Sequence, residues 1–177
     1  DLYNKRKDGS SGNMQDFFNN PGVYETNFTR FTSVTDLFIS GHFYGDGAPA
    51  FFTKEQAASS SFNIKVIADI SCDIRCPIPT TLRASTIAEP VYGYHKINGT
   101  ETDFNHPDAI TVMAVDNLPC ELPKDASIGF GDIFLKAVLP AFFNKDADGI
   151  LERARMTSNG KLTARFAYLQ DYLDGLE

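Results

Sequence analysis

The chain has 177 residues, of which 42% are apolar and 22% charged, and its formal net charge is −7. These values are typical of a globular protein with one domain or two partial domains, and they exclude a largely disordered chain. The negative charge argues against a nucleic-acid-binding surface, which requires clustered lysine and arginine. The one basic cluster, at 5–7, is followed at once by Asp8.

The cysteine and apolar patterns favour a cytoplasmic protein. Three cysteines are an odd number, which fits free thiols in a reducing compartment better than a disulfide framework. No stretch reaches the ~18–20 apolar residues of a membrane span, and no secretion signal is recognised. The polar start of the chain at Asp1, without a methionine, indicates a piece of a longer protein.

The first 35 residues are expected to form a loop and then two helices. Residues 1–13 are rich in Asp, Lys, Gly, Ser and Asn, which is typical of a loop. A helix is expected from Asn13, and Pro21 can begin a second one. In that second helix, apolar residues recur at helical spacing: Val23, Tyr24, Phe28 and Phe31.

Three short apolar runs predict the buried strands of a parallel sheet. They span 36–41, 64–70 and 109–115. Between the first two runs, Thr53 and Gln56 have the spacing of a capping box, which begins a short helix. Strand, helix and strand in this order imply a right-handed parallel crossover.

Residues 74–108 interrupt this pattern. They are rich in proline, include a β-prone stretch at 91–94, and carry Asn98-Gly99, the sequence of a hairpin tip. We expect a β insertion that lies over the edge of the sheet.

The end of the chain is expected to be helical. One helix should span about 125–143, a short one 150–155, and a last one should begin near Lys161. The fold class predicted from these elements is α/β, with the second half of a Rossmann-like parallel sheet, a β insertion and C-terminal helices. We expect a partial Rossmann-like nucleotide-binding domain at 1–119 and a C-terminal helical segment at 120–177.

Polar residues gather where two of the predicted strands end. Asp69 and Asp73 end the second run, and Val-Asp-Asn-Leu-Pro at 115–119 follows the third. Ligands of open α/β sheets bind at the carboxyl ends of the strands, so these positions indicate half of a nucleotide site. The two aspartates are candidates for acid/base chemistry or for anchoring a ligand. Alternatively, one caps a turn and the other is solvated.

Three other motifs predict no ligand. Gly45-x-Gly47 continues into Ala48-Pro49 without the third glycine of a pyrophosphate-binding loop. Cys72 and Cys76 do not make a zinc site, because the three histidines lie on scattered loops. The stretch 144–149 imitates an EF-hand, but Arg155 replaces the glutamate that calcium requires at position twelve. We expect no metal.

Several segments match a known family in order and roughly in spacing. They read Asp-Leu-Phe-Ile-Ser-Gly-His-Phe-Tyr at 36–44, Phe-Thr-Lys-Glu at 52–55, Ala-Asp-Ile-Ser-Cys-Asp at 68–73 and Val-Asp-Asn-Leu-Pro at 115–119. From about Phe17 onward, the chain resembles the C-terminal half of the lysine-forming saccharopine dehydrogenase and lysine-ketoglutarate reductase group. That group shares its fold with alanine dehydrogenase.

The resemblance implies two Rossmann-like domains with an active cleft between them. This chain would supply later strands of the nicotinamide-binding domain, and then helices that return to the catalytic domain. The cofactor would be NAD or NADP, the small-molecule substrate an amino acid, and the structural partner the missing N-terminal half of the same protein.

The resemblance also assigns roles to residues at the strand ends. Those implied to bind the cofactor are Gly41, His42, Val115, Asp116, Asn117 and Leu118. Phe43 and Tyr44 would border the substrate, and Asp73 would correspond to an aspartate that alanine dehydrogenases use in catalysis. The sequence departs from their pattern after Asp73, where Ile-Arg-Cys replaces Gln-Gly-Gly.

The family's proton-transfer lysine and histidine, its substrate-binding arginines and its glycine loop lie in the N-terminal half. We therefore expect the C-terminal portion of an amino-acid oxidoreductase, which would be inactive or nearly so on its own. The alternative is a stand-alone binding or dimerisation module, in which a homodimer covers the open edge of the sheet.

Overall fold

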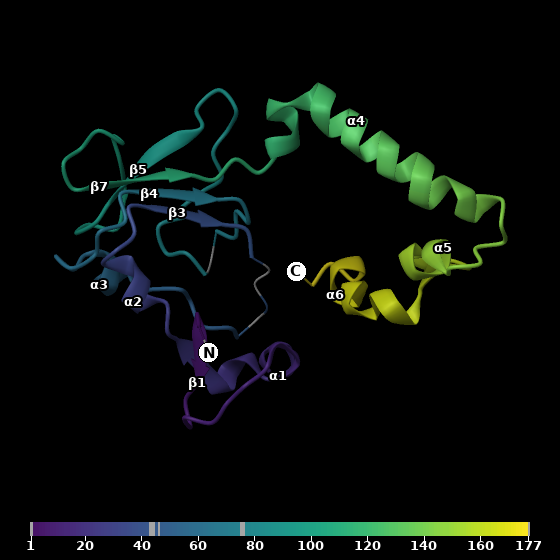
Figure 1. Cartoon of the computed structure of the whole chain (residues 1–177), viewed down its shortest axis with the longest axis horizontal. Coiled ribbons are helices and arrows are strands. Elements are labelled where there is room, and N and C mark those ends of the chain that lie inside the picture. The colour runs from purple at the N-terminus through teal and green to yellow at the C-terminus, as the bar shows by residue number, and fades with distance from the viewer. Residues whose placement is uncertain (1, 43–44, 46, 75–76, 177) are drawn as a thin grey trace. The chain divides into compact units, whose positions relative to one another are not determined.

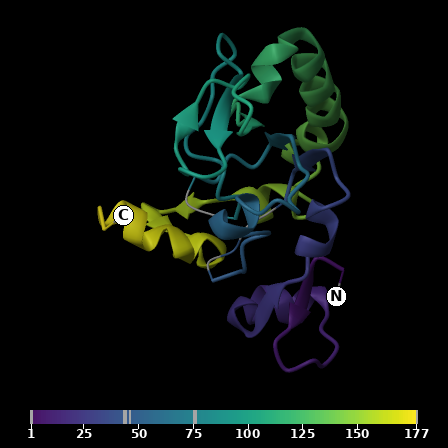
Figure 2. The ribbon, with the colours of Figure 1, turned by 90° about the vertical axis from the view of Figure 1, so that its left-hand side faces the viewer.

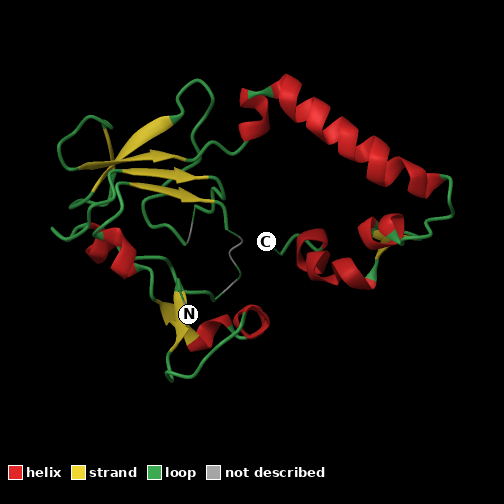
Figure 3. Ribbon diagram, in the orientation of Figure 1, coloured by secondary structure: helices red, strands yellow, loops and turns green. Residues whose placement is uncertain are grey.

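The computed structural model describes residues 2–42, 45, 47–74 and 77–176. The chain divides into two compact units, Asp1–Glu121 and Leu122–Glu177 (Figure 1). Figure 3 shows the main sheet in the first unit, whereas helices dominate the second. Among the described residues, no helix has the length and apolarity needed to cross a membrane.

A five-stranded sheet forms the first unit, in the order β3-β4-β7-β5-β6. The parallel strands are β3 (Leu37–Ser40), β4 (Val66–Asp69) and β7 (Ala109–Met113). They coincide with the three predicted apolar runs. The prediction of a mixed α/β fold with a parallel sheet and C-terminal helices is confirmed.

The insertion extends this sheet instead of lying over its edge, so that expectation was wrong. Strand β5 (Val91–His95) pairs antiparallel with β7, and β6 (Glu101–Thr102) pairs antiparallel with β5. The five residues between β5 and β6 include the predicted tip, where Gly99 has a φ of +66°. The backbone groups of β7 thus gain partners on both sides, which accounts for the placement of the insertion.

The hydrophobic core lies against one face of the sheet. Its sheet residues include Ile67, Val112 and Tyr92, and Phe52 packs against them from the segment before α3 (Lys54–Ala57). The capping box of α3 is present as predicted, with Thr53 and Gln56 bonded reciprocally. The opposite face carries exposed apolar side chains. On that face Leu37 is 53% exposed and Ile39 is 64% exposed.

The N-terminal segment differs from its prediction. Residues 4–6 form β1 (Asn4–Arg6), which pairs antiparallel with β2 (Tyr24–Thr26) where a helix was expected (Figure 2). Helix α1 (Met14–Asn19) forms with Asn13 as its cap. The helix expected at Pro21 is reduced to one 3₁₀ turn before β2, η1 (Pro21–Val23), and a single helical turn after it, α2 (Thr29–Thr32). Pairing with β1 overrides the local apolar spacing.

The second unit begins with a long helical run. It comprises α4 (Pro123–Ile133), the π-helical η3 (Phe134–Val138) and the 3₁₀ segment η4 (Leu139–Phe142). It matches the helix predicted at 125–143, and α5 (Ile150–Ala154) matches the short one. Most of its apolar side chains are exposed or half-buried, and in the described part of this unit only Ala141 is buried.

The last predicted helix starts later than expected. Residues around Lys161 form a hairpin of β8 (Thr157–Ser158) and β9 (Lys161–Leu162). Asn159 and Gly160 connect the strands, both with positive φ, as a tight hairpin turn requires. Helical structure resumes only in η5 (Ala164–Leu169) and α6 (Gln170–Leu173).

Candidate functional site at the carboxyl edge of the parallel strands

The three parallel strands end at one edge of the sheet, and the predicted site residues follow them. Ser40, Asp69 and Met113 are the last residues of β3, β4 and β7. The backbone N–H of Ile70 donates to the Ser40 carbonyl over 2.7 Å, which fastens the loop after β4 to the end of β3. The edge thus brings together the segments that contain Gly41, Asp73 and Asp116.

Asp69 is fully buried and its carboxylate organises the loop after β4. One oxygen, Oδ1, accepts the backbone N–H of Ser71 and of Cys72, each at 3.2 Å, and the Ser71 hydroxyl at 2.6 Å. The other, Oδ2, accepts the Thr81 hydroxyl at 2.6 Å. This is the turn-capping role that the sequence left open, and it ties the loop to the insertion.

Asp73, by contrast, is exposed at the far end of the same loop. The chain reaches it through Cys72, whose φ of +56° is uncommon for a residue other than glycine. Burial, together with the carboxylates of Asp69, Asp116 and Asp73, raises the pKa of the Cys72 thiol. That thiol therefore stays protonated at neutral pH, and Asp73 is an exposed acid of this edge.

Gly41 and His42 follow β3. A Cβ added to Gly41 would meet nothing within 4 Å among the described residues. The ring of His42 lies edge-on to Phe51, with centroids 4.7 Å apart, and its Nδ1 bonds the Ser40 hydroxyl. Its Nε2 is buried without a hydrogen-bond partner in the described structure. Burial lowers the pKa of His42, against the opposing charges of Asp69 and Asp73.

The side chain of His42 also lines two cavities, of about 450 and 460 Å³. Tyr3 and Phe51 line both as well. Most of the remaining lining is apolar, and the neutral imidazole of His42 adds a ring nitrogen that has no partner among the described residues. It can donate or accept one hydrogen bond, according to its tautomer.

The segment after β7 is fixed by contacts with Ser85 and is followed by an exposed turn. Val115 is buried and bridges to Ser85, whose hydroxyl accepts the N–H of Ala114 at 3.0 Å. Asp116 and Asn117 then lie exposed in a turn, and Leu118 begins η2 (Leu118–Glu121) half-buried. A rigid strand end followed by an exposed acid and amide can present polar groups to a ligand.

Two predicted residues, Phe43 and Tyr44, lie outside the described residues, as do Arg75 and Cys76. The structure also shows features that the sequence reading missed. Thr81 and Ser85, both in the insertion, hold the edge in place by hydrogen bonds. Nothing in their sequence spacing predicts these contacts. His95, His106 and Asp108 form a cluster at a different place in the sheet.

In the calcium-like stretch at 144–149, side-chain oxygens accept hydrogen bonds from backbone N–H groups. Both carboxylate oxygens of Asp146 accept helix N–H groups, from Leu151 and Glu152, each at 2.9 Å. The side chain of Asn144 likewise accepts the N–H of Ala147. These contacts are those of a turn that begins helix α5.

Comparison with known proteins identifies relatives. The chain is 26% identical to alpha-aminoadipic semialdehyde synthase of Arabidopsis thaliana over 176 residues, which covers 96% of the chain. It is 27% identical to the mitochondrial alpha-aminoadipic semialdehyde synthase of Mus musculus, with 89% covered. Saccharopine dehydrogenase (NAD(+), L-lysine-forming) of Schizosaccharomyces pombe is 28% identical over 67% of the chain. No protein-family profile matches.

The chain is a distant homologue of these enzymes. The resemblance noted in its motifs to the saccharopine dehydrogenase group is thereby confirmed. The chain spans only 16% of the Arabidopsis alpha-aminoadipic semialdehyde synthase, 20% of the mouse protein and 31% of the yeast saccharopine dehydrogenase. It corresponds to a small portion of each relative.

Proposed function

We propose that this chain is the C-terminal portion of an NAD(P)-dependent amino-acid oxidoreductase of the saccharopine dehydrogenase type. Such an enzyme would transfer a hydride reversibly at an amine-bearing carbon. The observation that carries the proposal is the homology over 96% of the chain to a semialdehyde synthase. The loops at the carboxyl edge of β3, β4 and β7 support it, because ligands of such sheets bind there.

The residues of this edge fit one wall of a nicotinamide site. Among the described residues, nothing crowds Gly41 and no group bonds the buried Nε2 of His42, and Asp116 lies exposed after a fixed strand end. When bound, the nicotinamide would accept or supply the hydride. Gly41, His42 and the turn Val115–Leu118 would contact it, and the neutral His42 would offer a hydrogen bond without adding charge.

Asp73 is the proposed catalytic residue of this chain. It is exposed, and the loop that carries it is fixed by the hydrogen bonds of Asp69. A carboxylate at this position can attract the ammonium group of an amino acid and hold a proton close to the reacting carbon. Phe43 and Tyr44 are proposed to border the substrate.

The remaining groups must come from elsewhere in a longer protein. The sequence has no glycine loop that could hold the pyrophosphate of a dinucleotide. We therefore expect the 177-residue chain alone to show no dehydrogenase activity.

The test is made on the longer protein encoded by the same reading frame. We expect upstream sequence with a strand, a G-x-G-x-x-G loop and an acid about 20 residues later. In that protein, Asp116→Ala should weaken NADH binding about tenfold, the effect of one lost hydrogen bond to a bound ligand. The matched control is Glu89→Ala, an exposed acid on another loop.

Two results would count against the proposal. A start codon directly before Asp1 would mean that the gene encodes no N-terminal half. Unchanged NADH affinity in Asp116→Ala, together with lost solubility, would mark Asp116 as a structural residue instead.

One observation favours the alternative of a stand-alone module. Strand β3 is paired on one side only within the described residues, and it carries the exposed Leu37 and Ile39. A module would cover this surface with a second copy and form a discrete dimer. A portion of a larger enzyme would instead associate without a defined stoichiometry when isolated.

A further inference from the structure

A cluster of three side chains that can bind a metal ion lies in the insertion. His95, His106 and Asp108 each offer one ligand atom, and these atoms all lie within 4.8 Å of one another. The two imidazole rings have centroids 4.9 Å apart and are inclined by 41°. His95 is half-buried, while His106 and Asp108 are exposed and accessible to an ion from solvent.

The backbone of the sheet holds the cluster together. His95 ends β5 and stands opposite Ala109, the first residue of β7, so 106–108 come next to it by register. The N–H of Lys96 donates to the Asp108 carbonyl over 3.0 Å, and that of Ala109 to the His106 carbonyl over 2.9 Å. His95 therefore sits on a paired strand, Asp108 directly precedes another, and the turn that contains His106 is bonded to the start of that strand.

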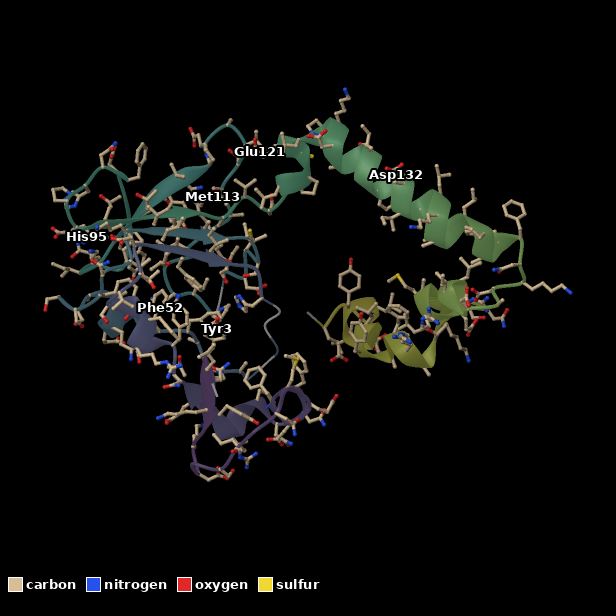
Figure 4. All side chains as sticks on the ribbon, viewed as in Figure 1. Tyr3, Phe52, His95, Met113, Glu121 and Asp132 are labelled. Carbon is tan, nitrogen blue, oxygen red and sulfur yellow. The ribbon has the colours of Figure 1, made fainter. Side chains whose placement is uncertain are left out.

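The cluster is separate from the candidate cofactor site. It lies where β7 begins, whereas the cofactor edge lies where β7 ends, at Met113. Figure 4 labels His95 and Met113 and shows them apart along the sheet. A ligand bound at one end does not need the other, so the inference is independent of the proposed oxidoreductase.

We propose that His95, His106 and Asp108 form a binding site for a borderline divalent cation, Zn²⁺ in preference to Mg²⁺ or Ca²⁺. Two imidazoles and a carboxylate are ligands that zinc accepts, with water in the fourth position. Zinc bond lengths place tetrahedral ligands about 3.3 Å apart. The three atoms, within 4.8 Å of one another, need to close by at most about 1.5 Å, which side-chain rotation can supply.

The hydrogen bonds of the two rings limit their affinity for zinc. Nδ1 of His95 accepts from the N–H groups of Ile97 and Asn98 at 3.3 and 3.4 Å, and Nδ1 of His106 from that of Asp108 at 3.1 Å. Because Nδ1 accepts these bonds, the ring proton lies on Nε2. Zinc binding at Nε2 therefore requires that proton to move to Nδ1, and these long bonds are then given up. We expect a dissociation constant on the order of micromolar, weaker than that of closed four-ligand sites.

A bound ion would join the end of β5 to the start of β7. It would thus close the loop of chain from 96 to 108, which includes β6 and its turn. Binding only to the folded chain stabilises it, so zinc should raise the Tm of the protein.

The experiment titrates the full chain with ZnCl₂ and follows binding by calorimetry and by ¹⁵N NMR of the imidazoles. We expect one zinc per chain, with shifted Nε2 resonances of His95 and His106 and an unshifted His42. His106→Gln and Asp108→Asn should each weaken binding by at least about tenfold. Backbone amide spectra establish that each variant is folded.

Two controls separate this site from other groups that bind zinc. Asp103→Asn changes an acid on the same insertion and should leave zinc affinity unchanged. Cys120→Ser removes an exposed thiol and should also have no effect. Zinc binding that survives both ligand variants but is lost with the cysteine would overturn the proposal, and so would an absence of binding at 1 mM zinc.

Discussion

At the scale of single residues, the carboxylate of Asp69 connects two segments by accepting four hydrogen bonds in a fully buried site. Removing it in Asp69→Ala leaves the Thr81 hydroxyl and two backbone N–H groups without their partner. We expect the free energy of unfolding to fall by about 2–4 kcal/mol, measured by urea denaturation. Asp73→Ala, at an exposed acid of the same loop, should change it by less than about 0.5 kcal/mol. Equal losses would contradict this division of roles.

His42 predicts a dependence of stability on pH. Because burial lowers its pKa, the folded state binds fewer protons than the unfolded state, whose pKa is about 6.5. The contribution of His42 to the free energy of unfolding is therefore complete above that value, and it is lost as the pH falls through the lowered pKa. We expect the Tm to decline between pH 7 and pH 5, and to decline less in His42→Gln. A slope that is the same in both proteins would contradict the assignment.

The difference between the buried Asp69 and the exposed Asp73 could be predicted in part from the sequence. Side chains alternate along a strand, so Asp69 shares the inward face of Ile67 and could be expected to be buried. Its partner Thr81 could not be expected, because a contact twelve residues away across a proline-rich segment depends on the path of the chain. The pairing of His95 with His106 was hidden for the same reason, since it requires the register of β5 with β7.

At the scale of elements, the insertion depends on a close approach at Gly93 in β5. A Cβ there would lie 2.5 Å from the carbonyl oxygen of Asp103, a backbone atom that cannot move aside alone. Gly93→Ala should therefore separate β5 from β6 and lower the free energy of unfolding by about 1–3 kcal/mol. Gly41→Ala is the matched control for stability, because its Cβ meets nothing within 4 Å in the part of the chain that the structure describes. The same urea denaturation compares the two, and a loss that is no greater at Gly93 would refute the clash.

Elements with local signals were predicted, and those defined by distant partners were not. Strands β3, β4 and β7 are continuous apolar runs, and the cap of α3 lies within four residues. Strand β1, in contrast, is polar and exists because β2 pairs with it from about 20 residues away. Local apolar spacing indicated a helix at β2, and strand pairing prevailed.

At the scale of the whole molecule, apolar surface left exposed is the main departure from an ordinary small domain. One face of the sheet presents Leu37, Ile39 and Val66, and α4 presents Ile128 and Phe130. Contiguous exposed apolar side chains mark surfaces that partners cover. The relatives are several times longer than this chain, and their additional residues can cover surfaces of this kind. The exposed apolar faces are therefore consistent with a match to only a small portion of each relative.

This surface predicts how the isolated chain behaves in solution. Since β3 is paired on one side only in the described residues and Ile39 is 64% exposed, we expect concentration-dependent association in sedimentation experiments. Ile39→Lys places a charge on the apolar face beside that edge and should shift the chain toward the monomer. The control is Ile97→Lys, a comparably exposed isoleucine (72%) in the turn after β5, which should leave association unchanged.

A chain that remains monomeric at all concentrations, or one that responds equally to both substitutions, would show that this face is not the site of association. A discrete dimer abolished by Ile39→Lys would favour the stand-alone module, whereas open-ended association would favour a portion of a larger enzyme.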